Sequence, residues 1–132
     1  MKPYAAVVAL VAFLAAGCGG ASSSSGPYTL AATKQCLVKT AGIKFAKVGP
    51  DDFVASTASN GSLRIRLPDS NAVTMLFGGS ANEASNLSDA YRRFRAANVG
   101  IEDVLRTENN VVLLWQLHPS LGDEKTIHRC LK

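Results

Sequence analysis

The chain has 132 residues, of which 47% are hydrophobic and 18% are charged, and this composition excludes global disorder. Its formal net charge of +4 is too weak a basic balance to indicate nucleic-acid binding. Once an export segment is subtracted, the length leaves room for one small domain.

The N-terminal residues have the layout of an export signal. A short positive start at Lys2 is followed by an uncharged apolar run over residues 4–16. As a helix this run would rise roughly 20 Å, which is less than the ~30 Å hydrocarbon core of a membrane. It is therefore typical of a signal peptide and not of a permanent membrane span.

The small-residue segment that ends at Cys18 resembles the bacterial lipobox. Ala16 and Gly17 match the small positions of that family, while the leucine, Leu14, lies one place earlier than usual. The resemblance implies that Cys18 receives a diacylglyceryl group and that residues 1–17 are removed as a signal peptide. It also implies anchoring to the cell membrane at the extracytoplasmic face. The alternative is an ordinary secretory signal that is cleaved near Ala16.

A polar tether follows the proposed anchor. Residues 18–28 are rich in Gly and Ser and end at Pro27 and Tyr28. Such a linker has a root-mean-square reach of roughly 16 Å, so it would hold the domain just off the membrane surface. We expect residues 29–132 to form that domain.

Apolar spacing and turn residues predict the elements of the domain. In chain order they are a helix over 29–41, a strand over 43–48, strands over 63–67 and 72–77 paired as a hairpin, a helix from Ser80 to Gly100, strands over 101–106 and 111–117, and a helix over 121–131. Residues 53–59 show no pattern that assigns them.

Two of the predicted strands determine the expected fold. In residues 63–67 three apolar side chains alternate with Arg64 and Arg66, so one face of that strand is apolar. Residues 72–77 are almost continuously apolar, which is typical of a central strand that is covered on both sides. Because most pairings would join neighbours in sequence, we expect an α+β fold. It would be a single small domain with an antiparallel sheet of about four to five strands and two to three helices on one face.

Helical spacing predicts which side chains the later helices bury. Ser80 and Glu83 have the spacing of a capping box at the start of the helix that is predicted to end at Gly100. The residues expected in the core are Ala84, Leu87, Tyr91 and Phe94 on that helix, Trp115 on the last strand, and Leu121, Ile127, Cys130 and Leu131 on the last helix.

Cys36 and Cys130 remain once Cys18 carries lipid. An even pair of cysteines in an exported, oxidising setting favours a disulfide, because free thiols are unusual there. Each lies on the predicted buried side of a terminal helix, so a bond would join the first helix to the last. The alternative is two buried free thiols that never meet.

Candidates for catalysis are few. Ser80 follows two glycines between a buried strand and a helix, a context typical of an oxyanion cradle and of a helix cap. We favour the cap, because the Gly-x-Ser-x-Gly pattern of a hydrolase is missing. Histidine occurs only at His118 and His128, and Glu124 one turn before His128 is typical of a solvated surface pair. We therefore expect no metal site and no cofactor.

The one basic cluster consists of Arg92, Arg93 and Arg95. Because the neighbouring aromatic side chains are assigned to the core, these arginines should form a solvated face of the helix and not a nucleic-acid surface. What they offer is weak attraction to anionic lipid or to an anionic polymer of the cell wall.

Together these features predict a lipid-anchored, non-enzymatic binding or interaction module of the cell envelope. Its partner would be an envelope protein or an anionic polymer, and not nucleic acid. The alternative is a small envelope hydrolase that uses Ser80 with His118 or His128. That alternative requires one histidine ring within hydrogen-bond reach of Ser80.

Overall fold

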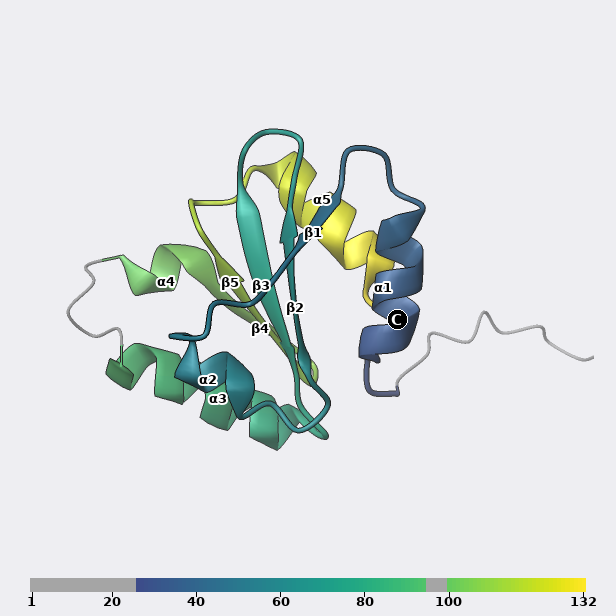
Figure 1. Ribbon diagram of the computed structural model, residues 1–132. Coiled ribbons are helices and arrows are strands. Elements are labelled where there is room, and N and C mark those ends of the chain that lie inside the picture. The colour runs from purple at the N-terminus through teal and green to yellow at the C-terminus, as the bar shows by residue number, and fades with distance from the viewer. Residues whose placement is uncertain (1–25, 95–99) are drawn as a thin grey trace, which may run out of the picture.

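The computed structural model of the chain describes residues 26–94 and 100–132, so Cys18 and Arg95 lie outside the described residues. The elements in chain order are α1 (Leu30–Val38), β1 (Lys44–Ala46), α2 (Phe53–Ser56), β2 (Ser62–Arg66), β3 (Ala72–Phe77), α3 (Ala81–Phe94), α4 (Ile101–Val104), β4 (Leu105–Glu108), β5 (Val111–Trp115) and α5 (Leu121–Cys130). Figure 1 shows the helices packed around one sheet, which confirms the predicted α+β class.

The sheet has five strands in the order β1-β2-β3-β5-β4, and every neighbouring pair is antiparallel. The predicted hairpin of β2 and β3 is confirmed, and β4 and β5 form a second hairpin. β3 and β5 are central and are buried at every residue. They are therefore covered on both sides, as the apolar run over residues 72–77 predicted.

Helices cover both faces of the sheet, so the expectation of helices on one face was wrong. One core lies under α1 and α5 and includes Leu37, Ile65 and Ile127. A second core lies under α2 and α3 and includes Leu87 and Leu114. In Figure 1, α2 and α3 lie together below the sheet, and α1 and α5 lie together on its right. Two apolar faces on the central strands require two helical layers.

Local chemistry explains two helical turns that the sequence pattern did not predict. Residues 101–104 form one helical turn, α4, and the strand that was predicted over 101–106 begins only at Leu105. Gly100, with a φ of 98°, precedes this turn, and the acidic Glu102 and Asp103 lie in it, where a helix start favours negative charge. The unassigned residues 53–59 contain α2, whose first turn is capped by Asp52 through the backbone N–H of Ala55 at 3.1 Å.

Two residues that were expected in the core are exposed. Leu121 is 85% exposed, because it lies about 120° around α5 from the buried Ile127. Phe94 is 73% exposed and packs edge-to-face on Phe53, with ring centroids 6.3 Å apart, at the last turn of α3. Trp115, in contrast, is buried as predicted.

The predicted disulfide is confirmed. Cys36 and Cys130 are bonded with their Cα atoms 5.3 Å apart and 94 residues apart in sequence, and Cys130 is fully buried. The bond fastens α1 to α5. Next to it, the backbone N–H of Thr29 donates to the carbonyl of Lys132 at 2.6 Å. The start and the end of the domain therefore lie side by side.

In the described residues, no helix combines the length and the apolar character that crossing a membrane requires.

Candidate functional site

One corner of the sheet carries polar side chains where the rest of that face is apolar. The register places Lys44 of β1 opposite Arg66 of β2, and Arg66 opposite Ala72 of β3. The row continues to Gln116, which lies just after β5. The backbone N–H of Gln116 donates to the carbonyl of Ala72 at 2.8 Å. These residues share the face that α2 and α3 cover further along. Lys44 and Arg66 are exposed.

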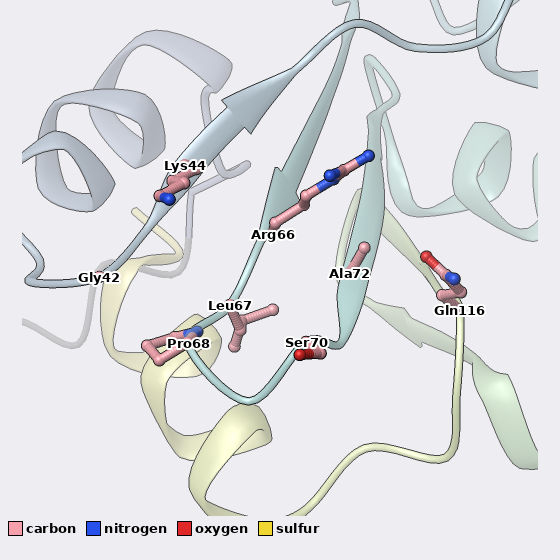
Figure 2. Close-up of a pocket in the computed structure, with 8 residues that line it drawn as sticks. All are labelled: Gly42, Lys44, Arg66, Leu67, Pro68, Ser70, Ala72 and Gln116. Carbon is pink, nitrogen blue, oxygen red and sulfur yellow. The ribbon is translucent and has the colours of Figure 1, made fainter.

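This corner forms a pocket of about 440 Å³ (Figure 2). Its lining residues are Gly42, Lys44, Arg66, Leu67, Pro68, Ser70, Ala72 and Gln116. Ala72 has the smallest side chain of the row and lies between Arg66 and Gln116, so the surface is hollow there. The β2–β3 turn, which contains Pro68 and Ser70, forms the rim.

The rim depends on a close approach at Gly42. This residue has a φ of 80°, and a Cβ atom there would lie 2.5 Å from Cγ of Pro68. Only glycine fits that conformation and that space. The loop between α1 and β1 therefore packs directly on the β2–β3 turn and closes one side of the pocket.

The charged side chains that line this corner are all positive. The lining residues include two cations and no carboxylate. Arg64 adds a third cation on the same face, and its guanidinium donates to Oγ1 of Thr74 at 2.8 Å and to Oε1 of Gln116 at 3.2 Å. None of the ion pairs formed within residues 26–94 and 100–132 involves Lys44, Arg64 or Arg66. Their charge is thus available to a ligand.

The arginine cluster that the sequence analysis identified differs from this corner, because its first member forms ion pairs. Arg92 contacts Glu102 at 2.7 Å and Asp89 at 3.0 Å. The hydrogen bond with Glu102 raises the pKa of Arg92 and lowers the pKa of Glu102. These carboxylates compensate the charge of Arg92. Arg93 is exposed, and Arg95 lies outside the described residues.

Ser80 and the two histidines are not brought together. Oγ of Ser80 accepts the backbone N–H of Glu83 at 3.1 Å, which is a helix-capping contact at the start of α3. Ser80 follows the end of β3 and His118 follows the end of the antiparallel β5, so the two lie at opposite ends of a strand pair about 17 Å long. His128 belongs to α5, on the other face of the sheet from α3.

The expected surface pair of Glu124 and His128 is replaced by two contacts with the edge strand β4. Nε2 of His128 contacts Oε1 of Glu108, and Glu124 lies 3.7 Å from Arg106. Two residues that are two positions apart on β4 thus contact two residues that are four positions apart on α5, because each pair points to one side of its element. In the part of the chain that the structure describes, no group of three or more His, Cys, Asp or Glu could hold a metal ion.

Glu83 has a role that its sequence pattern showed only in part. The predicted capping box keeps its Ser80 half, but the carboxylate of Glu83 accepts from the backbone N–H of Gly79 at 2.7 Å instead. It also accepts from the backbone N–H and the hydroxyl of Ser59, at 2.9 and 2.7 Å. These bonds, with the one from Gly79 strongest, lower the pKa of Glu83.

We expect Glu83→Gln to lower the free energy of unfolding by about 1–2 kcal/mol at neutral pH, because the amide replaces one acceptor with a donor that faces other donors. A depressed native pKa gives stability that is fully present above the unfolded value and is lost as pH falls through the native pKa. Urea unfolding at pH 7 and pH 3 should therefore show the gap between wild type and variant closing in acid. The exposed Asp69→Asn should show no such gap, and a Glu83→Gln gap that persists in acid would refute the charge-based explanation.

The pocket was missed at the level of sequence, although one signal for it was present. The apolar side of residues 63–67 implies an opposite side that carries Arg64 and Arg66. The chain matches no protein-family model, no curated protein and no solved structure in the comparisons made.

Proposed function

We propose that the protein is a lipid-anchored domain on the extracytoplasmic face of the cell membrane, and that it acts as a non-enzymatic binding module of the envelope. The lipobox-like segment before Cys18 supports the anchor. The helix-capping contact of Ser80, and its separation from His118, favour binding over hydrolysis.

The observation that carries this proposal is the disulfide between Cys36 and Cys130. Disulfides persist in oxidising compartments and are rare in the cytosol, so the bond supports export of the domain. It also accounts for two of the three cysteines in the chain. The third, Cys18, follows an apolar run and small residues, where lipid attachment would use its thiol.

Replacing Cys18 with alanine tests the anchor. Cells are fed an alkyne-tagged fatty acid, and the chain is followed through detergent phase partition. We expect the wild type to be labelled and to enter the detergent phase. Cys18→Ala should remain unlabelled, and should accumulate as an uncleaved precursor or leave the detergent phase.

The matched control is the double variant Cys36→Ala/Cys130→Ala, which removes two cysteines but should keep the label. A mature Cys18→Ala protein that still carries the label or still enters the detergent phase would refute the proposal. Label on the wild type that is lost only in the double variant would refute it equally.

A further inference from the structure

We propose that the pocket at the corner of β1, β2 and β3 binds a multiply charged, phosphate-bearing anion that arrives from the envelope space. This inference rests on the proposed function and gives the binding module a ligand class. It is carried by the cations around the pocket, which form no ion pair within residues 26–94 and 100–132, by the hydrogen-bond donors of the lining, and by the position of the pocket relative to the tether.

Three cations lie close together on the face of the sheet that carries the pocket. Lys44 and Arg66 are directly opposite on neighbouring strands, where side chains lie roughly 5 Å apart at their Cβ atoms. Arg64 lies two residues before Arg66 on the same face of β2. Like charges placed this way repel each other, and no carboxylate within the described residues forms an ion pair with them. A bound anion would remove this repulsion.

The lining of the pocket also presents several hydrogen-bond donors. Oε1 of Gln116 accepts from Arg64, which leaves the amide N–H groups of Gln116 as donors. Lys44, Arg66 and Ser70 add an ammonium, a guanidinium and a hydroxyl to the same lining. Guanidinium and ammonium groups bind phosphate oxygens with strong charge-assisted bonds. Arg64, held by Thr74 and Gln116, is a positioning residue for that amide.

The size and the position of the pocket fit a small ligand that arrives from the envelope space. The pocket volume of about 440 Å³ lies in the range of small-ligand sites, roughly 300–1,000 Å³. The described chain begins beside the β4–β5 turn, where Nδ2 of Asn109 donates to the carbonyl of Gly26. That turn adjoins the first residue of β5, whereas Gln116 follows its last residue. The pocket therefore lies at the end of the sheet opposite the proposed tether, away from the anchored membrane.

The test is calorimetric titration of the mature full chain in nonionic detergent with pyrophosphate at low ionic strength. We expect saturable binding that weakens with added salt. Lys44→Gln/Arg66→Gln should raise the dissociation constant about tenfold or more. Its midpoint of thermal unfolding should stay equal or rise, because the repulsion between the two cations is gone. The charge-matched control Arg93→Gln/Lys125→Gln should bind pyrophosphate within about twofold of wild type.

Absent binding, or equal weakening in both double variants, would overturn the proposal. Titration with glycerophosphoglycerol, the headgroup of phosphatidylglycerol without its acyl chains, distinguishes a lipid headgroup from the proposed multiply charged anion of the envelope space. We expect it to bind at least about tenfold more weakly than pyrophosphate, because it carries fewer charges. Equal affinity would assign the pocket to a membrane headgroup and contradict the proposal.

The two proposals fail separately. A wild-type chain that binds pyrophosphate but takes up no fatty acid would contradict only the anchor at Cys18. A lipidated chain that binds no pyrophosphate would contradict only the pocket.

Discussion

Replacing Cys36 and Cys130 together with alanine should lower the free energy of unfolding by about 2–5 kcal/mol. The bond closes a loop with a sequence separation of 94 residues, for which the chain-entropy account gives about 4.7 kcal/mol. It holds α1 against α5, and Cys130 is fully buried. For a domain of this size the loss is a large share of a typical stability of about 5–15 kcal/mol.

Urea unfolding of the oxidised wild type, the reduced wild type and the double variant measures this effect. The two forms without the bond should unfold at similar, lower urea concentrations, because both lose the same constraint on the unfolded chain. A double variant as stable as the oxidised wild type would show that the bond contributes nothing to stability.

Asn110→Ala should lower the free energy of unfolding by about 3 kcal/mol. Asn110 is fully buried, and its amide accepts the backbone N–H of Tyr28 at 2.7 Å. The same amide donates to the carbonyls of Tyr28 and Gly78 at 2.9 and 2.8 Å. Alanine would remove this partner from the N–H and the carbonyl of Tyr28, whereas the carbonyl of Gly78 keeps a second donor, Nδ2 of Asn60, at 3.2 Å. The cost is about 1–3 kcal/mol for each group that loses its partner, not fully additive.

Urea unfolding again gives the magnitude, and hydrogen exchange at the amide of Tyr28 should be faster in the variant because its acceptor is gone. Asn109→Gly is the neighbouring control: glycine accepts the positive φ of 50° at that position, and the lost bond to Gly26 is exposed. Its effect should stay below about 1 kcal/mol. An Asn110→Ala variant no less stable than this control would contradict the role of the buried amide.

The sequence predicted strands well where periodicity was strong. The alternation in residues 63–67 and the apolar run in residues 72–77 correspond to β2 and β3. The same apolar run already required cover on both faces, so the expectation of helices on one face conflicted with it. The short segments α2 and α4 are single turns, of which α2 is capped by Asp52 and α4 has no side-chain cap. Four residues carry too little period for a pattern to identify them.

The disulfide could be predicted because counting cysteines left one pair, and both members lay on buried helix faces. The pocket could not, because it depends on strand register. Nothing local in the chain places Lys44 opposite Arg66, or Gln116 beside Ala72. Those neighbours come from pairings between distant segments, which periodicity does not encode.

The buried asparagines were also outside the reach of pattern analysis. Asn71 and Asn110 both read as turn residues, and both do adjoin turns. In the fold, however, Asn71 accepts the backbone N–H groups of Ala72 and Leu117, at one end of the β3–β5 pair. Asn110 bonds Tyr28 and Gly78 at the other end. Their burial follows from the tertiary fold and not from the turn itself.

Intact-mass analysis of the mature protein, isolated from the membrane fraction without reductant, tests most directly that this is an exported, lipid-anchored domain. We predict a chain that begins at Cys18, carries the mass of an attached diacylglyceryl group, and lacks two hydrogen atoms because Cys36 and Cys130 are bonded. A chain without added lipid mass, whether it keeps residues 1–17 or begins near Ala16, would contradict the anchor. Two thiols that react with an alkylating agent under denaturing, non-reducing conditions would contradict the bond that supports export.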